Sequence, residues 1–270
     1  MRIVMPLFDF YNEGCKEYVF SGGRYSLCRF NASNEIPQIE LFSEQDVKFI
    51  EIENWALVAE GEGIESYKEE VNLLLLSFRI YRQARVFIKY RLCKENVEQC
   101  SRLNDFLHIV MPDESNRIIS FDDLNIIDKG FSKLQLMKGV SDRTRNAIYF
   151  MYRGLCSGKM IDAFLLLMCA IEALFSKEQA GGATTTICSR VSKFLGNKAG
   201  YEYQDIKGLY RLRSNITHGR VVVGDEIKGY LETLYKLQYI LLESMKKMLD
   251  ENIYPIYSDP AKKETYLCNL

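Results

Sequence analysis

Hydrophobic and polar positions recur with two different periods along the chain. Residues 1–115 mix short runs typical of strands with one stretch of helical period. Residues 141–255 have almost only helical spacing, with apolar positions three and four residues apart. Between them, residues 116–140 carry an acidic pair and a glycine, which indicate a linker or a peripheral segment. The pattern predicts the α+β class: an N-terminal mixed α/β segment, a C-terminal all-α bundle, and a C-terminal tail over residues 256–270.

The N-terminal segment contains the strand signals. A pair of glycines between two apolar runs predicts a β-hairpin over residues 18–30. Short apolar or alternating runs predict further strands at 47–52, 55–59 and 84–92, whereas residues 67–82 have the spacing of a helix. This segment is therefore expected to be an α+β domain.

The C-terminal part is predicted to be a bundle of five helices with short connections. The helices are expected at 141–156, 160–175, 184–195, 203–218 and 225–250. The second helix is apolar on almost all sides, which is typical of a helix at the centre of a bundle. Ser141 is placed to cap the first helix, and Gly219 to end the fourth.

Length and composition fit a globular protein of two domains. The chain has 270 residues, and a domain usually has about 100–200. With 47% hydrophobic residues, 26% charged residues and 5 prolines, disordered, collagen-like and linker-rich classes are excluded. The eight cysteines form no C-x-x-C pair, and of the two histidines His108 lies in an apolar run and is expected to be packed. No metal site and no cofactor are expected, and the cysteines are expected to be reduced.

Neither a membrane span nor a secretion signal is expected. The longest apolar stretch, 163–171, has nine residues, and about 20 are needed to cross a bilayer. Pro6 and Asp9 interrupt the apolar run at the N-terminus. The chain is therefore expected to be soluble and cytoplasmic, with no membrane partner.

The formal net charge of −1 hides an asymmetry between two halves. Residues 1–140 hold 17 basic and 22 acidic residues, whereas residues 141–270 hold 18 basic and 14 acidic ones. Within 184–220, seven basic residues are opposed by two acidic ones. Clustered positive charge is what a phosphate-binding surface requires. The alternative is an ordinary solvated helix face.

The stretch 209–220 combines the residue types that metal-free RNA cleavage needs. It holds three arginines, a serine, a threonine, an asparagine and a histidine at the end of the fourth predicted helix. The planar guanidinium matches phosphate, and histidine can accept and return a proton near neutral pH. Together they suit a reaction in which a 2′-hydroxyl attacks the adjacent phosphate while arginine stabilises the developing negative charge.

The spacing Arg213-x4-His218 resembles the R-x4–6-H motif of HEPN domains. The run I-E-A-L-F at 171–175 and the His-Gly pair at 218–219 resemble the ApeA-like HEPN branch, and the resemblance covers about 141–250. It implies a compact helical domain that forms a homodimer and cleaves RNA without a metal, with Arg213 and His218 as the catalytic residues. Such proteins often act in phage defence or toxin–antitoxin systems. Single-stranded or looped RNA and an antitoxin or defence protein are therefore the expected partners.

One departure from the family pattern leaves other interpretations open. Many active members have Asn, Asp or His directly after the arginine, whereas this chain has Ser214. The alternative to a ribonuclease is a non-catalytic HEPN module that binds RNA or a partner protein. A purely structural dimerisation domain is a third possibility.

Ideal helix geometry gives the two motif residues different surroundings. At about 100° per residue, Arg213 and His218 lie about 140° apart, and Arg213 is close to the apolar stripe. Arg213 is therefore expected to need an acidic partner, and Glu172 in the central helix is the predicted one. His218 shares a polar face with several residues expected to contact RNA or to assist catalysis. The full predicted auxiliary set is Arg211, Ser214, Asn215, Arg220, Arg190 and Lys193.

Overall fold

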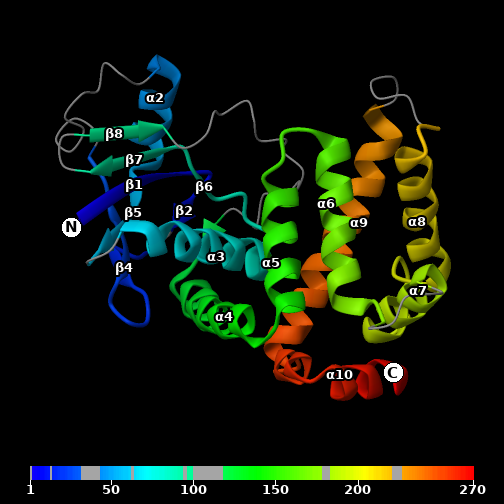
Figure 1. Ribbon diagram of the computed structural model, residues 1–270. Helices are drawn as coiled ribbons and strands as arrows, with labels where there is room; N and C mark the ends of the chain where they lie inside the picture. The colour runs from blue at the N-terminus through cyan, green and yellow to red at the C-terminus, as the bar shows by residue number, and fades with distance from the viewer. Residues whose placement is uncertain are drawn as a thin grey trace. The chain divides into compact units, whose positions relative to one another are not determined.

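The chain folds into two compact units, Met1–Ser132 and Lys133–Leu270, and the division falls within helix α4 (Phe121–Val140). The computed structural model describes residues 2–12, 14–31, 43–61, 64–93, 96–99, 118–177, 183–220 and 227–270 (Figure 1). Strands occur in the first unit, and the regular elements described in the second unit are all helices. The predicted order, a mixed part followed by a helical part, is therefore confirmed. His108 lies outside the described residues.

The first unit is built on an antiparallel sheet. Its strands follow the order β3-β4-β5-β1-β7-β8, with β6 also paired to β1. They are β1 (Arg2–Phe8), β3 (Glu17–Val19), β4 (Tyr25–Arg29), β5 (Trp55–Glu60), β6 (Phe87–Ile88), β7 (Tyr90–Cys93) and β8 (Asn96–Gln99). A separate parallel pair joins β2 (Tyr11–Asn12) to β9 (Ile118–Ile119).

The hairpin predicted over 18–30 and the strand predicted at 55–59 are confirmed as β3–β4 and β5. The sequence pattern does not predict β1, although β1 lies between β5 and β7 in the middle of the sheet. Every residue of β1 after Arg2 is buried, so the strand is apolar without alternation. A strand covered on both faces lacks the period of two on which sequence prediction relies.

Residues 47–52, expected as a strand, belong to helix α2 (Glu44–Glu53), so this prediction is wrong. The side chain of Ser43 accepts a hydrogen bond from the backbone N–H of Asp46, and acidic residues occupy the first turn. Both features favour the start of a helix. Asp46 and Ile50, one turn apart, are buried, so the segment covers the core with one helix face.

The strand predicted at 84–92 is interrupted at Lys89, which separates β6 from β7. Its buried ammonium group donates hydrogen bonds of 2.7 and 2.6 Å to the two carboxylate oxygens of Asp46. Burial alone would raise the pKa of Asp46, but hydrogen bonds from Lys89, Ser43 and Tyr90 outweigh it and lower the pKa. The pair ties α2 to the sheet.

Helices cover both faces of the sheet (Figure 1). On one face, Ile50 of α2 packs in a core with Phe8, Val58 and Phe87. On the other face lie α3 (Ile64–Arg82), which confirms the helix predicted at 67–82, and the first part of α4. Aromatic contacts fix these helices, and the pairs are Phe10–Phe78, Phe20–Phe78, Phe20–Phe131 and Tyr25–Phe131.

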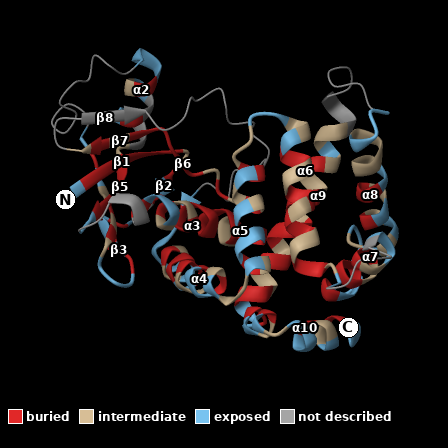
Figure 2. Cartoon of the chain, in the orientation of Figure 1, coloured by how far each residue is buried: buried red, intermediate tan, exposed pale blue. Residues whose placement is uncertain are grey.

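The second unit has α6 at its centre (Figure 2). Its elements after α4 are α5 (Asp142–Leu155), α6 (Met160–Phe175), α7 (Ala183–Phe194), α8 (Tyr203–Thr217), α9 (Ile227–Asp250), the 3-10 helix η4 (Tyr254–Ser258) and α10 (Pro260–Cys268). α6 contacts α5, α7, α8 and α9. The five predicted helices correspond to α5–α9, but they do not form the unit alone, because the end of α4, η4 and α10 also belong to it.

Two segments expected to lie outside the domains form helices. Most of the supposed linker or peripheral segment 116–140 is α4, in which Asp122 and Asp123 occupy the first turn. Acidic residues are favourable there because they oppose the positive end of the helix dipole. The buried face of α4 consists of Leu124, Ile127, Phe131, Leu134 and Met137. The supposed tail 256–270 contains the end of η4 and all of α10.

The C-terminal end of α6 explains why α10 is needed. The last carbonyl groups of a helix have no partner within the helix and must find donors elsewhere. Arg190 of α7 donates to the carbonyl of Phe175 at 3.1 Å. From the last part of the chain, Tyr257 donates to Leu174 at 3.0 Å and Lys263 donates to Ser176 at 2.8 Å. α7, η4 and α10 together close this helix end.

Candidate functional site

Helix α8 ends in a defined turn that holds the motif histidine. The backbone N–H of His218 donates to the carbonyl of Ser214 at 3.0 Å. Gly219 follows with a φ of 66°, a left-handed conformation that glycine adopts without steric cost. The N–H of Arg220 then returns to the carbonyl of Asn215 at 2.8 Å. The predicted helix end at Gly219 is confirmed, and the turn fixes the backbone of His218 and Arg220.

Arg213 forms the ion pair that the helical wheel predicts. One of its guanidinium nitrogens lies 3.6 Å from a carboxylate oxygen of Glu172 on α6. The pair is half-buried, with 39% of the Arg213 side chain and 28% of the Glu172 side chain exposed. The prediction of Glu172 as structural partner is therefore confirmed. The guanidinium still reaches solvent.

Tyr210 interacts with both members of this pair. Its hydroxyl is buried. Burial raises the pKa of Tyr210, and the nearby negative charge of Glu172 raises it further. The phenol therefore stays neutral at physiological pH and can donate a proton in a hydrogen bond, but cannot serve as a base.

His218 is exposed and separate from Arg213 within one protomer. No hydrogen bond or ion pair joins the two side chains in the described residues, and the imidazole has no such contact with other described groups. This separation agrees with the wide angle between the two positions on the helix. One protomer therefore does not bring the two predicted catalytic groups into direct contact.

Four of the predicted auxiliary residues line one pocket beside α8. The pocket has a volume of about 540 Å³. Its lining comprises Thr184, Gln204, Lys207, Gly208, Tyr210, Arg211, Ser214, Asn215 and Arg220. The structure thus brings together Arg211, Ser214 and Asn215, as the predicted polar face suggests, and adds Arg220 from the turn after the helix. Arg213 and His218 are not part of this lining.

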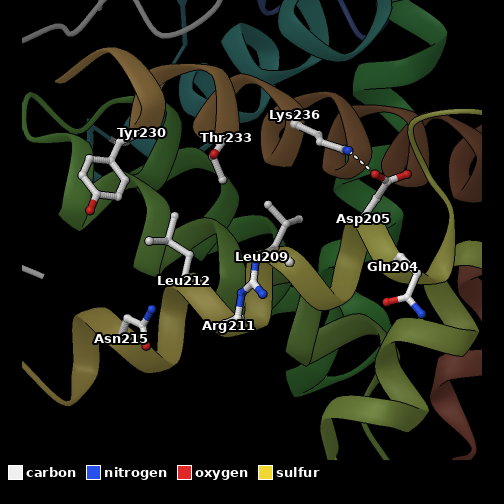
Figure 3. Close-up of a pocket in the computed structure, with 10 residues that line it drawn as sticks. Gln204, Asp205, Leu209, Arg211, Leu212, Asn215, Tyr230, Thr233 and Lys236 are labelled. Carbon is white, nitrogen blue, oxygen red and sulfur yellow. Dashed lines mark hydrogen bonds and ion pairs between the residues drawn. The ribbon is translucent and has the colours of Figure 1, made fainter. Parts of the chain in front are cut away.

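A second pocket of about 490 Å³ lies between α8 and α9 (Figure 3). It shares Gln204, Gly208, Arg211 and Asn215 with the first pocket and adds residues of α9. The contributions of α9 are Tyr230, Thr233 and Lys236. The ammonium of Lys236 donates to Asp205, and this hydrogen bond lowers the pKa of the Asp205 carboxyl.

Sequence reasoning does not identify the lining residues from α9, or Gln204, Lys207 and Gly208. One local signal was present. Gln204, Gly208, Arg211 and Asn215 follow the spacing i, i+4, i+7, i+11, which marks one face of a helix. The neighbour of that face lies about 20–30 residues further along the chain, and helical period does not reveal it.

Arg190 is not part of the site, and its assignment as an RNA-binding residue is corrected. Its side chain is buried, bonds to the carbonyl of Phe175 and forms an ion pair with Glu264 of α10. Burial alone would raise the pKa of Glu264, but the bond from Arg190 outweighs it and lowers the pKa. Lys193, one turn further, is exposed but lines neither pocket. The structure therefore does not group these two residues with Arg211 and Arg220.

The charges of the first pocket are not neutralised from within the protein. Lys207, Arg211 and Arg220 form no ion pair with any residue that the structure describes. By contrast, Arg213 and Lys236 each have a carboxylate partner. Exposed cations around a hollow of this size can hold a phosphate group. The electrostatics of α8 therefore favour an anionic ligand.

The described residues contain no cluster of three His, Cys, Asp or Glu side chains placed to hold a metal ion. The seven cysteines within the described ranges are free thiols. None of the helices in these ranges combines the length and apolar character needed to cross a membrane. Comparisons of the chain with models of protein families, with curated proteins and with solved structures gave no match.

Proposed function

We propose that this protein is a HEPN-type endoribonuclease that cleaves single-stranded or looped RNA without a metal, in phage defence or a toxin–antitoxin system. The observation that carries the proposal is the grouping of Lys207, Arg211 and Arg220, without acidic partners, next to the R-x4-H end of α8. RNA offers the negative charge that these side chains lack. The resemblance of α6 and α8 to HEPN segments supplies the reaction class.

The proposed reaction uses Arg213 and His218 for different tasks. The 2′-oxygen of a ribose forms a bond to the adjacent phosphorus while the bond from phosphorus to the 5′-oxygen breaks. An imidazole accepts the proton of the 2′-hydroxyl, and a protonated imidazole returns one to the leaving 5′-oxygen. Arg213 stabilises the added negative charge on the phosphorus centre. The products carry a 2′,3′-cyclic phosphate and a 5′-hydroxyl.

A homodimer is part of this proposal. The two proton transfers can use two imidazoles, one as the base and one as the acid. One protomer supplies a single imidazole, that of His218, at the end of α8. His218 is exposed at the end of α8, so a second copy can approach it without unfolding the helix. Pairing two such ends would place two histidines and two arginines around one phosphate.

The test is RNA cleavage in the presence of EDTA. Wild-type protein is expected to cut a single-stranded RNA and to leave 2′,3′-cyclic phosphate ends, whereas His218→Ala is expected to lose the activity. Lys193→Ala is the control, because Lys193 is an exposed cation that lines neither pocket. Equal cutting by wild type and His218→Ala would show that His218 is not catalytic. If wild type cuts no RNA, the proposed ribonuclease activity is wrong.

A second candidate function is a non-catalytic HEPN module that binds RNA or a partner protein. The ion pair between Arg213 and Glu172 favours it, because it gives Arg213 a structural role. In that case Arg213→Ala lowers stability, His218→Ala changes neither stability nor binding, and wild type binds RNA without cutting it.

A further inference from the structure

Gly208 differs from Gly130 and Gly154, two other glycines inside helices. A Cβ added at Gly130 would meet the ring of Tyr81 at 2.0 Å, and one added at Gly154 would meet Leu167 at 2.8 Å. These two glycines are therefore required by packing. A Cβ at Gly208 would meet no described atom within 4 Å, and the residue has no positive φ. Nothing in the described fold requires a glycine there, although glycine weakens a helix interior relative to alanine.

The position of Gly208 indicates that its lack of a side chain matters to a ligand and not to the fold. Together with Gln204, Arg211 and Asn215 it forms the outer stripe of α8 that both pockets share. The two pockets adjoin along this stripe, and we call them together the α8 groove. Figure 3 shows the part beside α9. The absence of a side chain at Gly208 leaves the helix backbone accessible in the middle of the groove. A ligand can approach the helix there more closely than beside any other residue type.

The walls of the α8 groove define the chemistry of such a ligand. Lys207 and Arg220 line the pocket beside α7, and Arg211 lines both pockets; none of the three has an acidic partner in the described residues. The one carboxylate in the lining, Asp205, is neutralised by Lys236. The positive charge of the lining therefore favours an anionic ligand. Amide groups that can bond to base edges come from Gln204 and Asn215.

We infer that the α8 groove seats a single strand of RNA, with a phosphate between Lys207, Arg211 and Arg220 and the sugar–phosphate backbone passing over Gly208. A single strand fits better than a duplex, because an unpaired nucleotide exposes its base edges to the amides and can enter a pocket of about 540 Å³. The inference takes its substrate from the proposed function. It concerns binding alone and does not depend on cleavage.

The test compares glycine substitutions at two open positions of the second unit. Gly208→Gln fills the α8 groove with a neutral side chain that favours helices, and Gly208→Ala adds a single methyl group. Gly139 in α4 is the matched control, because a Cβ there also meets no described atom within 4 Å and Gly139 lines neither pocket. The probe is a fluorescent 2′-O-methyl RNA 12-mer of mixed sequence, which has no 2′-hydroxyl to attack, and its binding to the full chain is followed by anisotropy.

Gly208→Gln is expected to weaken binding about tenfold, the size of a lost phosphate contact or two. Gly208→Ala is expected to weaken binding less while raising the midpoint of thermal unfolding by about 2–4 °C. Gly139→Gln is expected to leave the affinity within about twofold. Equal binding by wild type and Gly208→Gln overturns the inference, and so does a wild type that binds no RNA.

Three further outcomes distinguish this inference from the proposed nuclease activity and from the binding of an acidic peptide. A wild type that binds the 12-mer through the α8 groove but cuts no RNA would contradict the proposed nuclease activity and support the inference about binding. If wild type cuts RNA and Gly208→Gln binds and cuts it equally well, the inference about the α8 groove is wrong, whereas the proposed nuclease activity is supported. Displacement of the probe by polyglutamate as readily as by unlabelled RNA would show that the occupant is an acidic peptide, and would overturn the assignment to RNA.

Discussion

The C-terminal ends of α6 and α8 both meet positive charge, but they use it in different ways. At the end of α6, Arg190 and Lys263 are buried and bonded to the carbonyl groups of Phe175 and Ser176. At the end of α8, Arg220 is exposed and has no acidic partner in the described residues. The first set of cations completes the fold, and the second set is available to a ligand.

For the arginines, the difference between the two helix ends depends on whether the fold places a carboxylate beside them. α10 places Glu264 against Arg190, whereas no described acidic residue reaches Arg211 or Arg220. Charge counted along the chain treats these arginines alike, because all of them belong to the basic stretch 184–220. A basic cluster therefore becomes a binding surface only where the fold brings no acid to it.

Removing a buried cation at the C-terminal end of α6 is expected to have the largest effect on stability. Arg190→Met leaves Glu264 without its partner and the carbonyl of Phe175 without this donor. We expect the free energy of unfolding to fall by about 3 kcal/mol, the low end for a broken buried pair, because Glu264 is partly exposed. Urea denaturation measures this loss. The control Lys193→Met, at an exposed position one turn away, is expected to change stability by less than about 0.5 kcal/mol. A loss below about 1 kcal/mol for Arg190→Met would contradict the structural role.

The pH dependence of the same contact gives a smaller effect. The lowered pKa of Glu264 means that its ionised form stabilises the fold at pH values above the unfolded pKa of about 4.3. This contribution is lost as the pH falls through the lower pKa of the folded state. Glu264→Gln is therefore expected to lower the melting temperature at pH 6–7, and the gap from wild type should close below about pH 4. Melting curves between pH 3 and pH 7 measure it. A gap that widens in acid would show that the carboxyl is not ionised in the fold.

Arg213 lies between the two extremes. Because its ion pair with Glu172 is half-exposed, solvent screens it, and Arg213→Ala is expected to cost roughly 0.5 kcal/mol of stability. The same change is expected to abolish RNA cleavage if Arg213 acts on the phosphate. Denaturation and cleavage assays on one preparation separate the two roles. A loss of several kcal/mol would instead group Arg213 with Arg190 and Lys263, the buried cations that close the end of α6.

Replacing the exposed cations that lack an acidic partner is expected to have the smallest effect on stability. Replacing Lys207, Arg211 or Arg220 with alanine should change the free energy of unfolding by less than about 0.5 kcal/mol. Each change should reduce by about one the slope of log affinity for RNA against log salt concentration. Unchanged slopes would show that these side chains do not meet phosphate.

Much of the second unit can be predicted from helical period. The bounds of α6 agree with the expected 160–175, because the helix is apolar on nearly all sides and is flanked by breaks in the pattern. The pair of Arg213 and Glu172 is also predictable, since a helical wheel directs Arg213 toward the core and Glu172 interrupts the apolar run of α6 beyond its first turn. Periodicity is sufficient where the decisive contacts are made by a central helix.

Other features depend on contacts that local pattern does not contain. The role of Arg190 depends on Glu264, which is 74 residues away in the sequence. The acidic pair at 122–123 indicates a loop by composition but serves the first turn of α4. The α8 groove needs α9 beside α8, and β1 is too uniformly apolar to show a strand period. Except for the acidic pair, whose role lies in its own helix, these features depend on contacts with segments that are distant in the sequence.

The closure of α6 by η4 and α10 also sets an order of events during synthesis. A nascent chain made from its N-terminus produces residues 254–268 after every other helix of the second unit. Until then, the end of α6 lacks its bonds from Tyr257 and Lys263, and Arg190 lacks Glu264. The helical unit therefore completes its folding late. If it is a ribonuclease, its helical unit is still incomplete while the chain is beside the messenger RNA that encodes it.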